Sequence, residues 1–146
     1  MDLESQHPIH NYALLFSQLT PHNLPRIADL LSDEIVFSDP FNLTRGRDKF
    51  IRIFQHMFDV MENPKFEILD LSFSSRAGYI KWRLTGKVKR WRRISINITG
   101  MSEVINDESG LITAHYDHWD SASQLLAFIP VLGLPTVWLL RLLRTK

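Results

Sequence analysis

The sequence predicts an α+β fold in which helices come first and an antiparallel sheet follows. Up to Met61 the apolar residues recur at helical spacing, and after Asn63-Pro64 they alternate along the chain, which is typical of strands. Helices that precede an antiparallel sheet in the chain usually cover one face of it. We therefore expect a single domain over residues 1–146, with N-terminal helices packed on the sheet.

Three helices and a short strand are expected before the sheet. In chain order they cover about residues 10–18, 25–31, 35–37 (the strand) and 47–61. The last helix follows Gly46 and is the most amphipathic, so one of its faces should be buried. Its apolar positions are Phe50, Ile53, Phe54, Met57, Phe58 and Met61.

Four further strands are expected after the helices. They cover about residues 66–71, 79–88, 94–104 and 111–120, with turns at 76–78 and 106–110. On the third of these strands, alternation places Ile96, Ile98, Gly100 and Ser102 on one face.

Asp39 is the most informative polar residue of the helical half. It ends the short strand, and Pro40 restricts it to extended backbone, so its side chain should be held rigidly. A carboxylate in an apolar pocket becomes a better base because its charged form is disfavoured. The alternative is a turn residue that holds the loop 42–47.

Four motifs together resemble one family. They are DPFN at Asp39–Asn42, Gly46-Arg47 at the start of a helix, NDESGLI at 106–112 and HYDHWD at 115–120. This pattern resembles the NTF2-like superfamily, and within it the SnoaL-like and ketosteroid-isomerase-like branch, over roughly residues 12–126. The resemblance implies a cone, in which a bent sheet wraps around the long helix and encloses an apolar pocket, often within a homodimer.

The same resemblance implies roles for individual residues. In the isomerase the carboxylate of the DPF motif is the general base, and Asp39 occupies that position. The tyrosine of the oxyanion hole would fall at Leu15, which cannot donate a hydrogen bond, and the protonated acid would fall at Ser102. One oxyanion donor is worth about 3 kcal/mol, so steroid isomerisation itself is not expected.

The last strand supplies further candidates. Trp119 aligns with an aromatic residue of the isomerase pocket, which brings Asp117 and His115 to the same face, where they could form an acid/base pair. The alternative is that they are buried polar groups paired for stability alone. The predicted catalytic residues are Asp39, Ser102 and His115, and the predicted ligand contacts are Phe54, Phe58, Trp82, Ile98, Asp117 and Trp119.

Composition excludes several classes of protein. The chain has no cysteine, which removes disulfides and thiolate chemistry, and its net charge of +1 argues against nucleic-acid binding. The basic hairpin 87–93, with Trp91 in it, is interpreted as a solvated tip, and the alternative is a site for nucleic acid or acidic lipid. His118 and Asp120 lie on the strand face opposite to His115 and Asp117, so neither a metal site nor a cofactor is expected. No signal peptide is found, and we expect a cytoplasmic protein.

The C-terminal tail, residues 125–146, is strongly apolar. Pro130, Gly133 and Pro135 divide it and leave 136–143 as its continuous helix, too short to span a bilayer. Three placements are expected in decreasing order: over the mouth of the cone, in a homodimer, or on a membrane surface.

These patterns lead to two functional hypotheses. The first is a domain that binds a small hydrophobic molecule, with cofactor-free proton transfer of the isomerase or polyketide-cyclase type and Asp39 as base. The second is a non-catalytic carrier or protein-interaction module, because one fold hosts both kinds of function.

Overall fold

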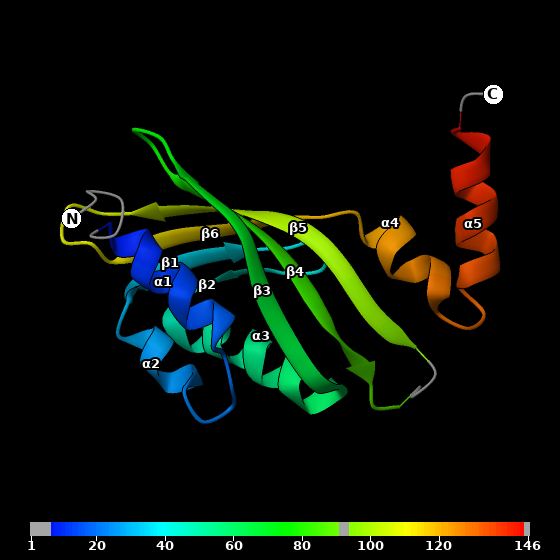
Figure 1. The fold of residues 1–146 in the computed structure, drawn as a ribbon, viewed down its shortest axis with the longest axis horizontal. Coiled ribbons are helices and arrows are strands. Elements are labelled where there is room, and N and C mark those ends of the chain that lie inside the picture. The colour runs from blue at the N-terminus through cyan, green and yellow to red at the C-terminus, as the bar shows by residue number, and fades with distance from the viewer. Residues whose placement is uncertain (1–6, 91–93, 145–146) are drawn as a thin grey trace.

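The computed structural model describes residues 7–90 and 94–144. Helices and strands follow each other along the chain as Figure 1 shows. Their bounds are α1 Pro8–Ser17, α2 Leu24–Ala28, β1 Leu31–Ser38, β2 Leu43–Arg45, α3 Arg47–Val60, β3 Met61–Phe73, β4 Gly78–Val88, β5 Ser95–Asn106, β6 Ile112–His118, α4 Ser121–Gln124, the 3₁₀ turn η2 Leu126–Phe128, and α5 Gly133–Leu142.

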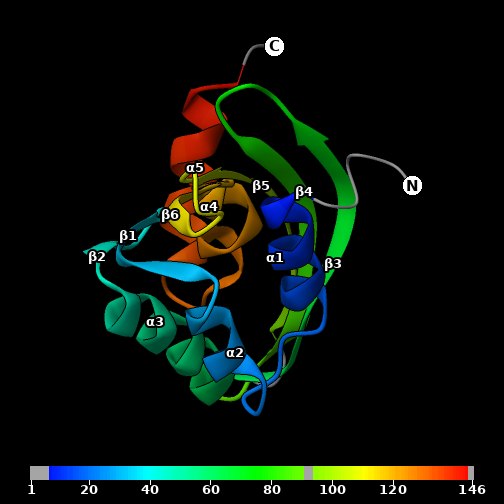
Figure 2. The same ribbon diagram turned by 90° about the vertical axis from the view of Figure 1, so that its left-hand side faces the viewer.

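One six-stranded sheet in the order β2-β1-β6-β5-β4-β3 forms the frame. All neighbouring strands are antiparallel except β1 and β6, which are parallel. The sheet curves around α1, α2 and α3, which lie together on its concave side (Figure 2). The predicted α+β fold, with N-terminal helices packed on a mostly antiparallel sheet, is confirmed.

The long helix α3 is placed by its N-terminus and by two phenylalanines. Gly46 precedes it with φ 106°, a conformation that glycine adopts without strain. Phe50 and Phe54 are buried, and their ring centroids lie 5.4 and 5.8 Å from that of Phe37 on β1. This aromatic cluster attaches α3 to the sheet edge that carries Asp39.

Several element boundaries differ from the prediction, and strand pairing explains two of them. The second helix ends at Ala28, because Leu31 already pairs with Ile112 and opens β1 as a strand of eight residues. The long helix ends at Val60, and Met61 opens β3 opposite Val88. Pairing with distant strands decided both positions, and local periodicity contains no information about it.

The predicted break at Asn63-Pro64 is instead a bulge inside β3. Asn63 has φ 50°, and the register with β4 shifts between Glu62 and Lys65. Because β3 is an edge strand, a residue without an N–H donor is tolerated there.

The hairpin between β4 and β5 is closed by a hydrogen bond of 3.1 Å from Val88 N–H to the Ile94 carbonyl. Residues 91–93 lie outside the described residues, and the interpretation of the basic tip falls partly on them.

The tail begins with a capped turn. Asp120 accepts a hydrogen bond of 3.0 Å from the Ser123 N–H at the start of α4, and hydrogen bonds from Ser123 hold the pKa of Asp120 below its ordinary value. The helix α5 begins at Gly133, earlier than predicted, because Pro135 lies in its first turn, where no N–H is needed. It packs on α4 and η2 and projects from the end of the molecule (Figure 1), and none of its residues lines the cavity described below. No helix within residues 7–90 and 94–144 is long and apolar enough to cross a membrane.

Candidate functional site

An apolar cavity of about 280 Å³ opens between α3, the loop after β1 and the concave side of the sheet. Pockets that hold small organic ligands start at about 300 Å³, so this cavity suits a small ligand. Four of its lining residues carry polar or charged groups on otherwise apolar walls: Asp39, Asn42, His56 and Asp117.

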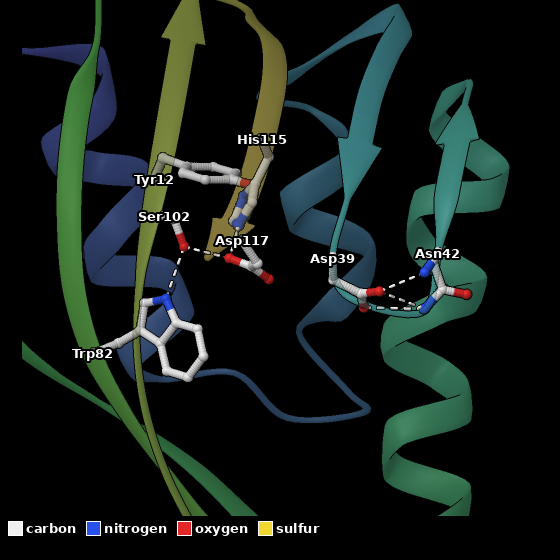
Figure 3. A network of polar contacts seen from close by, with 7 residues as sticks. All are labelled: Tyr12, Asp39, Asn42, Trp82, Ser102, His115 and Asp117. Carbon is white, nitrogen blue, oxygen red and sulfur yellow. Dashed lines mark hydrogen bonds and ion pairs between the residues drawn. The ribbon is translucent and has the colours of Figure 1, made fainter. Parts of the chain in front are cut away.

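A chain of hydrogen bonds lies behind one wall of the cavity (Figure 3). The Tyr12 hydroxyl lies 2.7 Å from Nδ1 of His115, and Nε2 of His115 lies 2.8 Å from Oδ1 of Asp117. From the other side, Ser102 Oγ lies 2.5 Å from the same Oδ1, and Trp82 Nε1 lies 2.8 Å from Ser102 Oγ. We call these five residues the polar chain.

The sheet register explains why the polar chain assembles. Ser102 on β5 and Asp117 on β6 are direct cross-strand partners, and His115 shares the face of Asp117 two residues earlier. Trp82 on β4 reaches across Gly100, where an added Cβ would stand 2.5 Å from the indole ring. Glycine at this position therefore lets the indole lie flat enough for its N–H to meet Ser102.

The donors and acceptors of the polar chain can be assigned one by one. The indole of Trp82 only donates, so Ser102 accepts from it and gives its own hydrogen to Asp117. A carboxylate only accepts, so Nε2 of His115 carries the hydrogen of that contact, and in the Nε2–H tautomer Nδ1 accepts from Tyr12. Both hydrogen bonds to Asp117 therefore end on Oδ1.

The second oxygen of Asp117 has no such partner. Within the described residues no group donates a hydrogen bond to Oδ2, and the side chain is 15% exposed and lines the cavity. A carboxylate that is anchored through one oxygen and open through the other can accept a proton from a bound ligand.

Tyr12 lies at the closed end of the polar chain. Its side chain is fully buried in the aromatic core, where it contacts Phe16. Burial, and to a smaller extent the negative charge of Asp117, raise the pKa of Tyr12 well above its ordinary value. Tyr12 therefore stays a neutral donor to His115.

Asp39 is held in a different way. Its Oδ1 accepts hydrogen bonds from the backbone N–H groups of Phe41, at 2.8 Å, and Asn42, at 2.6 Å. The Asn42 side-chain amide lies 3.0 Å from both carboxylate oxygens. Asp39 lines the cavity, but it makes the contacts of the turn residue that was the alternative interpretation. Its role as a base stays a prediction.

The remaining predicted site residues differ in whether they line the cavity. Phe54, Trp82, Ile98 and Trp119 line the cavity, whereas Phe58 is not among its lining residues. Ser102 and His115 lie behind the wall, where they line a void of about 10 Å³.

Two polar lining residues were not predicted. The sequence indicates Asn42 only as part of the DPFN motif. His56 lies on α3, where nothing in the helical spacing distinguishes it from a solvent-exposed residue. Among the described residues, no three His, Asp or Glu side chains converge on a point that could hold a metal ion.

Comparison with known families supplies the identification. The family model for the SnoaL-like domain matches residues 13–115. The chain belongs to the SnoaL-like family. Among curated proteins, none matches this SnoaL-like sequence.

Solved structures with this fold have low sequence identity to the SnoaL-like chain. A protein with a ketosteroid isomerase-like fold from Catenulispora acidiphila DSM 44928, in complex with trimethylamine, has 16% identity and a TM-score of 0.71 over 91% of this chain and 97% of that one. A candidate SnoaL-like polyketide cyclase from Shewanella putrefaciens CN-32 has 15% identity and a TM-score of 0.65 over 86% of each chain. An epoxide hydrolase from M. tuberculosis has 12% identity and a TM-score of 0.64 over 94% of each chain.

These similarities show the NTF2-like, ketosteroid-isomerase-like fold of this SnoaL-like protein. The predicted homodimer and cytoplasmic location stay predictions.

Proposed function

We propose that this SnoaL-like protein binds a small hydrophobic carbonyl compound in the cavity and moves a proton within it, with Asp117 as the base. The observation that carries the proposal is the asymmetry of the Asp117 carboxylate. Oδ1 is held by Ser102 and His115, whereas no described residue donates a hydrogen bond to Oδ2, and Asp117 lines the cavity. This assignment replaces Asp39, the base expected from the motif, whose carboxylate is engaged by its own loop.

The proton transfer needs no further reactant. Oδ2 takes a proton from the carbon next to the ligand carbonyl, the C–H bond breaks, and the electron pair moves to give an enolate. The proton then returns from Oδ2 to a carbon of the same molecule, which forms a new C–H bond and restores the carboxylate. A positioned base of this kind contributes about 100-fold to 10,000-fold to the rate.

The enolate oxygen requires a hydrogen-bond donor. The His56 imidazole and the Trp119 indole N–H both belong to the lining, and in the described part of the chain neither has a hydrogen-bond acceptor. We assign the ligand oxygen to this side of the cavity. Trp119 is held there by edge-to-face contact with Phe41, at 5.7 Å between ring centroids.

One observation favours a second candidate, a non-catalytic binding protein. The hydrogen of Ser102 is donated to Asp117, so Ser102 cannot also donate it to a ligand oxyanion. Without a preorganised donor, most transition-state stabilisation of the isomerase type is lost, whereas binding of an apolar molecule is retained.

Small cyclic ketones test the proposal in two steps. Titration of the ¹⁵N-labelled protein with cyclohexanone and 2-cyclohexenone should shift the indole N–H signals of Trp82 and Trp119, which line the cavity. In D₂O the protein should then accelerate exchange of the protons next to the carbonyl, as measured by proton NMR. Binding without exchange would select the non-catalytic candidate, and the absence of both would contradict the proposal.

A further inference from the structure

Of the fourteen large apolar side chains that are exposed among the described residues, eight lie in the C-terminal tail. Val131 and Leu134 are 90% and 85% exposed, and α5 contains no buried residue. Trp138, Leu142 and Leu143 add 64%, 61% and 76% exposure of large side chains. Proteins seldom leave contiguous apolar surface of this kind in water, and where it occurs it marks an interaction site.

The apolar residues of α5 are not confined to one stripe. Leu134, Trp138 and Leu142 follow each other at four-residue spacing on one side, and Leu139 lies on another, followed four residues later by the C-cap residue Leu143. A helix that is apolar on several sides requires an apolar environment around it rather than a single flat contact. With ten residues it is too short to cross a bilayer.

The charge of the tail has one sign. From Ser121 to the end of the sequence there is no Asp or Glu, whereas Arg141, Arg144 and Lys146 are basic. Both arginines are exposed, Arg141 in the last turn of α5 and Arg144 just after the helix ends. An apolar segment that is followed by basic residues matches a surface with an apolar interior and anionic head groups.

We propose that the tail docks the protein onto an anionic lipid bilayer. Leu134, Leu139 and Leu143 enter the boundary between head groups and acyl chains, where the Trp138 indole is also favoured. Arg141 and Arg144 then meet the lipid phosphates. The tail of a second copy is the less fitting occupant, because it has the same positive charges and no Asp or Glu to pair with them.

The docked position has a consequence for the cavity. Leu125 is the first residue of the tail and also lines the cavity, so the tail starts at the cavity wall. Docking brings that wall close to the bilayer and gives lipid-soluble ligands a short route in. This consequence rests on the proposed function, whereas the docking itself does not.

Vesicle binding of the full chain tests the docking. Vesicles of phosphatidylcholine with about 30% phosphatidylserine should bind the protein, and pure phosphatidylcholine should bind it much more weakly. Each basic residue near an anionic surface strengthens binding about fivefold, so the Arg141→Glu/Arg144→Glu variant should bind at least about 20-fold more weakly. Trp138 fluorescence should shift to shorter wavelength on binding.

Matched controls separate the tail from the rest of the surface. The Leu134→Ser/Leu139→Ser variant should lose binding. The control is Leu14→Ser on α1, whose side chain is 51% exposed, and this variant should keep binding. The Arg26→Glu/Lys49→Glu variant reverses two exposed charges on α2 and α3 and should retain binding to within about threefold. Circular dichroism checks that each variant is folded.

Three results would overturn the proposal. They are the absence of binding to the anionic vesicles, equal binding by the tail variants and the wild type, and a dimer in vesicle-free buffer that Leu134→Ser/Leu139→Ser converts to a monomer. The last result, measured by sedimentation velocity, would assign the tail to a second copy of the chain. Because none of these measurements uses the cavity, they remain informative if the proposed proton transfer is absent.

Discussion

Ser102 and Asp117 face each other across β5 and β6, and the Ser102 hydroxyl donates a hydrogen bond of 2.5 Å to Oδ1 of Asp117. His115, two residues earlier on β6, contacts the same oxygen. The two contacts together orient the carboxylate. The other oxygen has no hydrogen-bond donor among the described residues, and Asp117 lines the cavity. The arrangement of the site therefore depends on a strand pairing as well as on a sequence motif.

Replacing Ser102 by alanine should destabilise the protein. The substitution leaves the buried Trp82 indole N–H without an acceptor and removes one donor from Asp117. An unsatisfied buried polar group costs about 1–3 kcal/mol, so the free energy of unfolding in urea should fall by that amount. Ser95→Ala, at an exposed position of the same strand, is the control and should change stability by less than about 0.5 kcal/mol. Equal effects of the two substitutions would contradict the assigned network.

Gly100→Ala should displace the Trp82 indole. The new Cβ would stand 2.5 Å from the ring and 2.9 Å from Cβ of Trp119, so the side chains on both sides must move. Overpacking of this kind costs about 1–3 kcal/mol. The Trp82 indole N–H signal should also shift in the NMR spectrum as its hydrogen bond to Ser102 is lost. Retention of both the stability and the signal position would show that the ring tolerates a side chain there.

Ile98→Phe should block ligand binding with little loss of stability. Ile98 lines the cavity of about 280 Å³, so the larger ring can enter existing space instead of compressing the core. We expect a change in the free energy of unfolding below about 1.5 kcal/mol. The affinity for 2-cyclohexenone should fall at least about tenfold, which corresponds to 1.4 kcal/mol. Ile105→Phe, on the same strand but outside the cavity lining, should leave the affinity unchanged.

The burial of Tyr12 predicts that the free energy of unfolding falls at alkaline pH. Its folded-state pKa is raised, chiefly by burial, so this group stabilises the fold fully below the unfolded value of about 10. As the pH rises above 10, the unfolded chain releases the phenolic proton while the folded chain keeps it, and stability falls. The decline should be smaller in Tyr12→Phe, and the difference in phenolate absorbance between wild type and variant should appear only above pH 10. Titration of this difference at or below pH 10 would contradict the burial of Tyr12.

Much of the site was predictable from alternation. Ser102 shares a face with Ile98 on β5, and His115 and Asp117 share a face on β6, as the two-residue period requires. The motif at Asp39 also predicted a rigid strand end correctly. Alternation gives the face but not the partner, so it could not show that Ser102 and His115 bind the same oxygen of Asp117.

What the sequence could not predict depends on contacts between distant residues. Tyr12 and His115 are 103 positions apart in the sequence, and no local pattern pairs them. The length of β1 depends on its parallel pairing with β6, which explains why Leu31 was placed in a helix. The first residue of α5 was predicted incorrectly for a different reason. A proline in the first helical turn does not prevent the helix from starting before it.

The central claim is that Asp117, and not Asp39, is the base of the site. The most direct measurement compares Asp117→Asn with Asp39→Asn, since both carboxylates line the same cavity. Each asparagine keeps an oxygen for the existing hydrogen bonds and loses the capacity to accept a proton. We predict that exchange of the protons next to the carbonyl of 2-cyclohexenone falls about 100-fold to 10,000-fold in Asp117→Asn and less than about tenfold in Asp39→Asn. The reverse order would contradict the claim and assign the base to Asp39.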